Sequence, residues 1–417
     1  MSRSTLRIAW RNLGRNKRRT LLAIGAIALG QATLVFVNGL MAGSFNNMIK
    51  AVTGPLVGHV QIHHRQWREE RAIDLTIDNV SRLSAEIRAL PTVKSVLPRI
   101  YAPALSASGE QKDQPAAAEP AVIVGVDAEG EAGKGGLLES LTPDELPREQ
   151  SVVIGEALAN RLSIAPGQSI AIIGQDANGY PVSDLFHVRG IVKSSVDIVK
   201  TMGVVMSIAD ASKLLDMPDK AHEIIVHGED YNRAEALAAL IAQLPALAGA
   251  EVVWWRESLP ELGTLIDLKG WFDLIFLAIV FVAAAAGIAN TATMSTFERT
   301  HEFGMLLAVG ARPRRIVSMV IIESIVVGLV GVAIGSVIGA AIVMITSRTG
   351  IDYAALGGIR ADDIAFSGLS LSYVIYPILE ARHIVFGVLA VTATSVIASV
   401  WPAALASRLE PVKAMNL

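Results

Sequence analysis

Four long stretches of this chain are apolar and almost free of charge. They cover residues 20–49, 274–297, 316–347 and 383–407, and Glu323 is the single charged residue within them. Each exceeds the roughly 18 apolar residues that a helix needs to cross a bilayer. Charged residues make up 18% of the chain, against about 25% in an ordinary soluble domain. The sequence therefore predicts an integral membrane protein with four transmembrane helices.

The first apolar stretch is longer than a membrane crossing requires. As a helix, its 30 residues would extend about 45 Å at ~1.5 Å per residue, whereas the hydrocarbon core is about 30 Å thick. Asn38, Asn46 and Asn47 lie toward its far end, so we expect the helix to leave the membrane there and continue as a stalk. A cleaved signal peptide is the alternative, but its apolar core spans only about 7–15 residues.

Positive charge is concentrated at the ends of the apolar stretches that share one side of the membrane. Residues 1–19 hold seven Lys and Arg, and the segments 298–315 and 408–417 are also net positive. By contrast, residues 51–270 hold 19 Lys and Arg against 30 Asp and Glu. Cytoplasmic flanks of membrane helices retain Lys and Arg. The sequence thus predicts two cytoplasmic termini and a large extracytoplasmic domain.

The basic N-terminal segment has a helical pattern of its own. Its arginines recur every four residues, at Arg3, Arg7, Arg11 and Arg15. Leu6, Trp10 and Leu13 occupy a neighbouring apolar face. This spacing predicts an amphipathic helix on the membrane surface before the first span.

Residues 50–270 are enough for one or two compact domains and mix strand and helix patterns, which predicts an α+β fold. We expect helices at 75–91, 156–162, 209–215 and 232–244, and strands at 93–97, 121–126, 151–154, 169–173, 186–192, 204–207, 224–226 and 252–255. The segment 107–136 is rich in Ala, Pro, Gly and charged residues on either side of its central strand. We interpret its two halves as exposed, mobile loops.

The sequence contains no recognisable motif for phosphate binding, metal binding or nucleophilic catalysis. The phosphate-binding pattern Gly-x-x-x-x-Gly-Lys-Ser/Thr does not occur, and the glycines around Lys134 lack its spacing. His63 and His64 are adjacent and so point apart, and no third metal ligand has a sensible spacing. There are no cysteines, and no serine lies in a nucleophile-elbow context. We therefore expect no catalytic, cofactor-binding or metal site.

Two features of the third apolar stretch indicate how its helix packs: a row of glycines and a single carboxylate. The third stretch contains glycines on one helical face, which lets backbones approach closely; they are Gly328, Gly331, Gly335 and Gly339. Residues 283–287 are small and available as the opposing surface. Glu323 is costly inside the membrane and should face the bundle, a polar neighbour or the membrane interface. An ion path is the functional alternative, but no partner for a relay is visible in the sequence.

The short loop between the second and third apolar stretches predicts an amphipathic helix. Phe303, Leu306 and Leu307 would share one face, Glu298 and Glu302 would flank another, and Gly310 is a natural C-terminal stop. Such a helix could rest on lipid. Because it is tied to two spans, it could also receive a push from a partner and transmit it.

This loop carries a family resemblance. The run from Glu298 to Ala311 resembles the signature of FtsX-like permease domains, which occur in MacB-type and lipoprotein-releasing (LolC/LolE-type) ABC transporters. Further similar segments are Glu323 followed by Gly328 and Gly331, residues 408–414, and residues 9–13 with 17–20. Residues 153–159 and 166–168 look like the MacB-type extracytoplasmic domain. His301 and Phe303 depart from the pattern, which has a charged or polar residue at the first position and an aliphatic residue at the second.

The resemblance implies a dimerising permease subunit that uses a separate cytoplasmic ATPase, present in two copies, which binds the ATP and Mg²⁺. It implies that the second permease subunit is identical or paralogous, that the cargo is a lipoprotein or another amphiphile, with or without a periplasmic carrier, and that no nucleic acid is involved. The localisation implied is the bacterial inner membrane, in contact with its lipids. The residues implied in ATPase coupling are Glu298, Arg299, Glu302, Phe303, Gly304, Gly310 and Ala311.

The full prediction divides the chain into nine segments. They are a basic helix (1–19), a first transmembrane helix with stalk (20–49), an extracytoplasmic α+β domain (50–270), a second transmembrane helix (271–297), a cytoplasmic coupling loop (298–315), a third transmembrane helix (316–347), an extracytoplasmic loop (348–382), a fourth transmembrane helix (383–407) and a cytoplasmic tail (408–417). The function expected is a permease without its own ATPase, most similar to the lipoprotein-releasing type. The alternatives are an FtsX-like regulator of an extracytoplasmic partner and an integral membrane enzyme.

Overall fold

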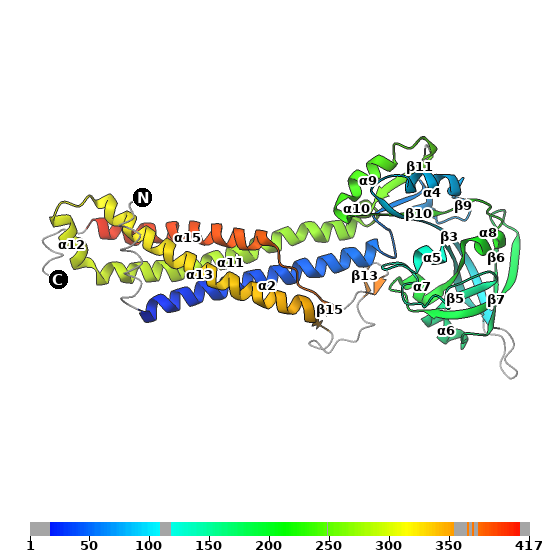
Figure 1. Ribbon diagram of the computed structural model, residues 1–417, viewed down its shortest axis with the longest axis horizontal. Coiled ribbons are helices and arrows are strands. Elements are labelled where there is room, and N and C mark those ends of the chain that lie inside the picture. Colours follow the sequence, from blue (N-terminus) through cyan, green and yellow to red (C-terminus); the bar gives the residue numbers. More distant parts are fainter. Residues whose placement is uncertain are drawn as a thin grey trace. The chain divides into compact units, whose positions relative to one another are not determined.

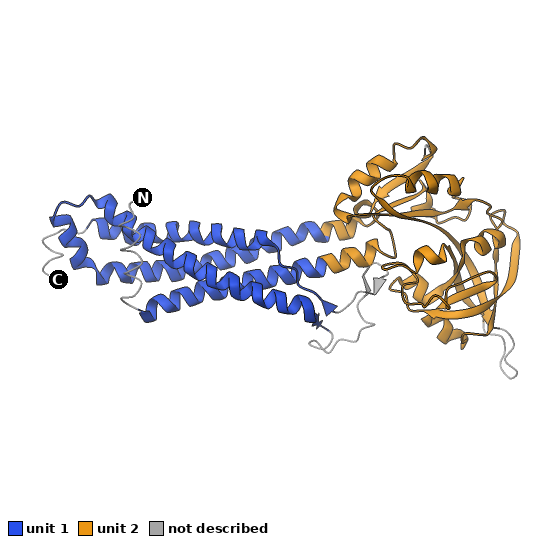
Figure 2. Ribbon diagram, in the orientation of Figure 1, with its two compact units in different colours: residues 1–45, 265–356, 373–417 blue, residues 46–264, 357–372 orange. Residues whose placement is uncertain are grey.

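The protein is described from a computed structural model, which covers residues 17–108, 118–247, 249–353, 365–366, 369–370 and 374–408. The chain divides into two compact units (Figure 2). Unit 1 comprises residues 1–45, 265–356 and 373–417, and unit 2 comprises residues 46–264 and 357–372. Both boundaries near the long helices fall inside a helix, so two helices continue from one unit into the other.

Unit 1 is built from long apolar helices that lie side by side (Figure 1). They are α2 (Lys17–Thr53), α11 (Pro260–Glu298), α13 (Pro313–Thr349) and α15 (Ala381–Ser407), with the short α12 (Thr300–Ala308) between α11 and α13. Among the described residues, these four long helices are long and apolar enough to cross a membrane. The four expected spans are thus present as helices. The expected amphipathic helix at 1–19 falls mainly outside the described residues, as does the tail after Arg408.

Two of these helices are longer than the apolar patterns that predicted them. Helix α2 continues to Thr53, past the asparagines that suggested an exit from the membrane. Helix α11 begins at Pro260, so residues 260–270, which the sequence placed in the outer domain, form its first turns. At ~1.5 Å per residue, the 39 residues of α11 extend about 58 Å. Between α13 and α15, the two-residue strands β12 (Ile351–Asp352) and β15 (Val374–Ile375) pair, as do β13 (Ala365–Phe366) and β14 (Leu369–Ser370).

The glycines of α13 lie where other helices approach it most closely. A Cβ on Gly335 would lie 2.3 Å from the Ala28 carbonyl oxygen of α2, and one on Gly339 would lie 2.9 Å from Val35 Cβ. Gly331 faces Ile27 of α2, and Gly328 faces Ser395 of α15. Residues 283–287 were expected to face these glycines and do not, although Ala284 packs in one cluster with Val327 and Val332 of α13. Helices α2 and α15 are the partners.

A buried glutamine lies among these helices. Gln31 of α2 is fully buried, and its Nε2 donates to Ser336 Oγ of α13 at 3.2 Å. Gly387 of α15 leaves room for it, since a Cβ there would lie 2.1 Å from Gln31 Oε1. A hydrogen bond between membrane helices adds to packing that lacks a hydrophobic driving force.

Unit 2 contains a nine-stranded sheet in the order β11-β1-β10-β3-β4-β8-β5-β7-β6. Its strands are β1 (Val60–His64), β3 (Val93–Ser108), β4 (Ala118–Val126), β5 (Ser151–Gly155), β6 (Ser169–Gln175), β7 (Pro181–Val192), β8 (Gly203–Ser207), β10 (Glu223–Gly228) and β11 (Ala250–Trp254). The short β2 (Ile77–Asp78) and β9 (Lys220–Ala221) pair separately. The helices are α3 (Trp67–Glu70), α4 (Val80–Arg88), α5 (Ala128–Glu131), α6 (Glu156–Leu162), α7 (Asp197–Met202), α8 (Ile208–Leu214), α9 (Ala234–Ile241) and α10 (Trp255–Ser258). The expected α+β fold is confirmed, although β1, α7 and the short elements α3, α5, α10, β2 and β9 were not expected. The helix expected at 75–91 covers only Val80–Arg88, because β2 occupies Ile77–Asp78.

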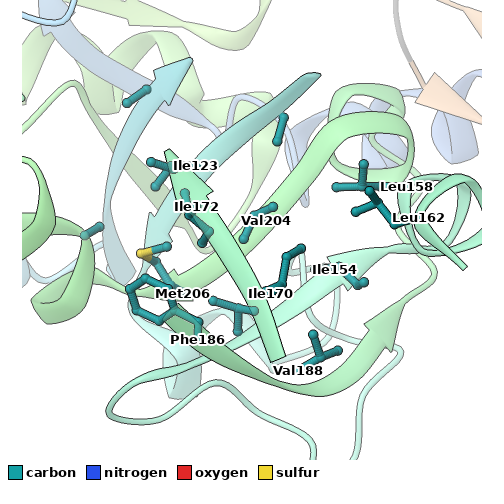
Figure 3. Close-up of a cluster of buried hydrophobic side chains, with 14 of the residues drawn as sticks. Ile123, Ile154, Leu158, Leu162, Ile170, Ile172, Phe186, Val188, Val204 and Met206 are labelled. Carbon is teal, nitrogen blue, oxygen red and sulfur yellow. The ribbon is translucent and has the colours of Figure 1, made fainter. Parts of the chain in front are cut away.

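The second half of β3 closes six strands into a ring. Residues 104–108 of β3 pair with residues 170–174 of β6, in addition to the pairing of β3 with β4. Alternate side chains then point into a common core, as expected for a closed sheet. Ile123, Ile154, Ile170, Phe186, Val204 and Met206 meet there, each at most 2% exposed (Figure 3). Leu158 and Leu162 of α6 cover the same cluster.

The first half of β3 belongs to a second core. There β10 pairs with β3 and β1 lies between β10 and β11. Their buried side chains, including Ile62, Val96 and Ile224, pack against α4 and α9. A single 16-residue strand therefore takes part in both cores of unit 2.

A fully buried ion pair lies beside the middle of β3. Arg99 Nε and Glu131 Oε1 are 2.6 Å apart, and both side chains are at most 1% exposed. Glu131 Oε2 also accepts from the Leu137 amide at 3.0 Å, and Arg99 Nη1 donates to the Leu56 carbonyl at 3.2 Å. The expectation of a mobile loop up to residue 136 was thus wrong. Helix α5 carries Glu131 into the interior, and only residues 109–117 of that segment lie outside the described part.

One buried and two half-buried histidines predict that unit 2 is less stable in acid. Burial lowers the pKa of His59 to about 4, and burial also lowers the pKa of His222 and of His227. The neutral rings accept backbone hydrogen bonds, from Gly228 N–H to His59 Nδ1 and from Tyr101 N–H to His222 Nδ1, both at 3.0 Å. In the unfolded chain a histidine has a pKa near 6.5, whereas in the folded chain these three rings bind a proton only at lower pH. Their stabilising contribution is therefore present above about pH 6.5 and is lost as the pH falls toward 4.

We expect the melting temperature of unit 2, measured on the full chain in lipid nanodiscs, to be lower at pH 5 than at pH 7.5. His59→Gln should reduce this difference, because glutamine does not titrate. Equal melting temperatures at the two pH values would contradict the expectation.

Candidate functional site

The backbone leaves helical geometry at both ends of α12, which separates it from α11 and α13. Helix α11 ends at Glu298, and Arg299 leaves helical geometry with φ −112° and ψ 17°. At the other end, Gly310 has a φ of +93°. The Gly310 amide donates to the Leu307 carbonyl at 3.0 Å and the Ala311 amide to the Leu306 carbonyl at 2.9 Å. This pair of bonds is the Schellman motif, which fixes the end of the helix.

Arg299 connects α12 to the interior of α13. Its Nη1 lies 2.8 Å from Glu323 Oε2, and its Nε lies 3.0 Å from Glu302 Oε2. The Arg299 side chain is 9% exposed and that of Glu323 is 18% exposed, so the pair is largely withdrawn from solvent. Ser295 of α11 adds a weak contact, with its Oγ 3.5 Å from Glu323 Oε1. The guanidinium therefore joins α12 to α13, and Glu323 in turn contacts α11 through Ser295.

The aromatic ring of Phe303 completes the attachment. It is 1% exposed and packs in a cluster with Ala292 of α11, Ile316 and Val320 of α13, and two alanines of α15. The Arg299 guanidinium carbon lies 4.8 Å from the centre of the ring, within the range of a cation–π contact. The packing of Phe303 and the ion pairs of Arg299 thus hold α12 together at adjacent positions.

A second ion pair joins the beginning of α2 to the end of α11. Arg19 Nη1 lies 2.9 Å from Glu298 Oε1. These side chains are 22% and 43% exposed, so the pair is weaker than a buried one. It nevertheless connects α2 to the same end of unit 1 that carries α12.

The structure brings most of the expected coupling residues together, with corrections. Glu298 belongs to the end of α11 and not to α12, Gly304 is buried in α12, and Gly310 with Ala311 forms its end. Of the expected apolar face, Phe303 is buried, whereas Leu306 is 41% exposed. Glu323 faces polar neighbours within the bundle, as expected, and they are Arg299 and Ser295.

Arg19 and Ser295 also belong to this site, although the sequence did not indicate a role for either. Arg19 was counted only as part of the basic prefix, and Ser295 stood in an apolar stretch. No local pattern signals either contact, because each residue lies on a different helix from the carboxylate that it contacts. The arrangement can hold helices together and transmit their displacement. Within the described ranges, no group of three or more His, Asp or Glu is placed to hold a metal ion.

Family models match both parts of the chain. The model described as MacB-like periplasmic core domain matches residues 20–244, which is more than half of the chain. The chain belongs to the FtsX-like and MacB-type family of ABC transporter permeases. The model described as FtsX-like permease C-terminal matches residues 274–411, and these residues include α12, Arg299 and Glu323. The resemblance noted in the sequence is therefore confirmed.

Individual relatives of this permease are distant in sequence. The lipoprotein-releasing system transmembrane protein LolE of Haemophilus influenzae is 22% identical, and the match covers 98% of both chains. The corresponding protein LolC of Neisseria meningitidis serogroup B is 23% identical, over 77% of this chain and 76% of LolC. The macrolide export ATP-binding/permease protein MacB of Azoarcus is 26% identical over 59% of this chain. This permease spans only 37% of the length of that MacB.

Proposed function

We propose that this permease transmits the work of a cytoplasmic ATPase, supplied by another subunit, to its extracytoplasmic unit 2. In this proposal α12 lies on the cytoplasmic side, where the ATPase contacts it. The single observation that carries the proposal is the attachment of α12 through Arg299 to both Glu302 and Glu323. A helix fixed in this way moves together with α11 and α13 and does not rotate on its own.

Continuous helices provide the path of transmission. Helices α2 and α11 each run from unit 1 into unit 2 without a break. A displacement of α11 at Glu298 therefore reaches Pro260 through one hydrogen-bonded helix. The phosphates and Mg²⁺ would be held by the ATPase subunit, since this chain has no phosphate-binding loop pattern.

The proposed class of cargo is based on the similarity of this chain to its relatives. Because the match to LolE covers nearly the full length of both chains, we propose lipoprotein release, or export of a related amphiphile, from the inner membrane. A second permease subunit, identical or paralogous, completes the complex. Regulation of an extracytoplasmic partner without transport is the alternative outcome of the tests below.

The test is isolation of the complex from native membranes, followed by mass spectrometry of its bound proteins and lipids. The wild-type chain should bring down a nucleotide-binding subunit and show ATP hydrolysis. Glu302→Lys reverses a charge on a partly exposed position of α12 and should reduce recovery of that subunit at least about tenfold, which corresponds to ~1.4 kcal/mol. Membrane insertion should be unchanged.

Glu235→Lys on α9 is the matched control, because it makes the same charge reversal at an exposed position of unit 2. It should leave recovery of the ATPase intact. Full ATPase recovery and hydrolysis with Glu302→Lys would contradict the coupling role of α12. Depletion of the protein then separates the alternatives: an exporter's loss leaves cargo in the inner membrane, whereas a regulator's loss alters cell-wall turnover.

A further inference from the structure

A cavity in unit 2 is lined mostly by apolar side chains. Its volume is about 540 Å³, within the range of about 300–1,000 Å³ typical of small-molecule sites. It lies beside the middle of β3 and next to α7, both labelled in Figure 1. Apolar walls are formed by Val57, Val122, Leu137 and Val199, and Ile198 lies at the rim with 42% of its surface exposed.

Three arginines line this cavity, against a single carboxylate. Arg68 and Arg71 are exposed and Arg99 is buried, while Glu223 is the one acidic residue of the lining. The carboxylate of Glu223 is already engaged, because its Oε1 accepts from Arg71 Nη1 and from Trp67 Nε1, both at 2.7 Å. Arg71 also lies over the Trp67 ring, 5.1 Å from its centre. Since Arg99 is paired with Glu131 and Arg71 with Glu223, the net positive charge of the lining comes from Arg68.

Two polar atoms of the lining have no hydrogen-bond partner in the described part of the chain. They are Arg99 Nη2 and Ser258 Oγ, both buried. Leaving a buried donor unpaired is costly, so each is a place where a ligand oxygen would be favoured. Ser258 lies next to Arg68, whose Nη2 donates to the Ser258 carbonyl at 3.1 Å. An exposed cation and an unpaired hydroxyl thus meet at one side of the cavity.

Tyr101 adds a neutral donor to the wall. Burial raises the pKa of Tyr101 to about 12, so its hydroxyl keeps its proton at physiological pH. Arg99 keeps its charge as well: burial lowers its pKa, but Glu131 and Tyr101 together raise the pKa above its usual value. The wall therefore presents donors and positive charge beside apolar side chains.

We propose that this cavity binds an amphiphile with one apolar chain and an anionic head group. The head group, a carboxylate or a phosphate, lies between Arg68, Arg71 and Ser258, and the chain lies against Val57, Leu137 and Val199. Anionic oxygens form the strongest hydrogen bonds with arginine, and the apolar walls favour the chain. The proposal does not depend on ATPase coupling, since every lining residue belongs to unit 2.

The experiment uses the full chain in phosphatidylcholine nanodiscs with a diazirine-bearing dodecanoate as the photoreactive probe. Labelled peptides identified by mass spectrometry should contain cavity residues such as Leu137 and Val199. Unlabelled dodecanoate and dodecyl phosphate serve as competitors, and the stronger of the two identifies the head group. Dodecanol, which has the same chain and no charge, should compete poorly.

Exposed positions provide variants that leave the fold intact. Arg68→Glu should lower labelling at least about tenfold, because a charge-assisted hydrogen bond is replaced by repulsion. Arg82→Glu, at another exposed arginine of unit 2, should not change labelling. Ile198→Asp should also lower it, whereas Leu185→Asp, at an exposed leucine away from the cavity, should not. Equal competition by dodecanol, or full labelling of Arg68→Glu, would overturn the proposal.

Discussion

Arg299→Met is expected to abolish coupling while leaving the chain in the membrane. Methionine keeps much of the apolar packing on Phe303 but removes the guanidinium that binds Glu302 and Glu323. Glu323 would then remain largely buried with only the weak contact from Ser295. Removing one partner of a buried pair costs about 3–5 kcal/mol. The attachment of α12 to α13 should therefore open far more often than in the wild type.

Hydrogen exchange of the α12 amides measures this opening directly. A loss of about 3 kcal/mol corresponds to roughly 100-fold faster exchange, and cargo-dependent ATP hydrolysis of the isolated complex should fall to its basal level. Arg299→Met with Glu323→Leu should restore part of the protection, because no unpaired carboxylate remains. Arg348→Met makes the same change in the last turn of α13 and should have no effect. Wild-type protection in Arg299→Met would contradict the role assigned to the ion pair.

Arg99→Met is expected to destabilise unit 2 by about 3–5 kcal/mol. The variant leaves Glu131 fully buried without its cation and also removes the hydrogen bond to the Leu56 carbonyl. In a domain of this size, about 1 kcal/mol corresponds to roughly 2–4 °C, so the melting temperature should fall by about 10 °C. Thermal unfolding of the full chain in nanodiscs provides the measurement.

Two further variants separate the ion pair from general effects of the substitution. Arg99→Met combined with Glu131→Leu should lose much less stability than Arg99→Met alone, because apolar residues of similar volume often replace a buried pair at little cost. Arg82→Met removes an exposed pair with Glu86 and should cost under about 1 kcal/mol. If Arg99→Met melted like Arg82→Met, the buried pair would not stabilise unit 2.

The sequence predicted those parts of the structure that depend on local pattern. The four long helices follow from uninterrupted apolar stretches, and the strands of unit 2 follow from alternation along the chain. The end of α12 was also predictable, because Gly310 adopts a positive φ that favours glycine over other residues. The lengths of α2 and α11 were less accurate, since a helix that continues past its apolar stretch gives no hydrophobic signal for its end.

Pairings between distant residues were not predictable in the same way. Glu323 had several basic residues near it in sequence, including Arg312, Arg314 and Arg315, yet its partner is Arg299 on the other side of α12. Glu131 lies in a segment whose composition resembles a loop, and only the approach of β3 brings Arg99 to it. Which basic residue pairs with a given carboxylate depends on which helices and strands pack together in the tertiary structure.

By itself, the sequence determined the number of membrane-spanning helices, the α+β character of unit 2, and the amphipathic element between α11 and α13. Only the tertiary structure decided that β3 closes a ring with β6, that the α13 glycines face α2 and α15, and that Arg299 binds Glu323. The reason is physical: periodicity and capping act between residues a few positions apart, whereas ring closure, glycine contacts and buried ion pairs require segments far apart in the chain to pack together.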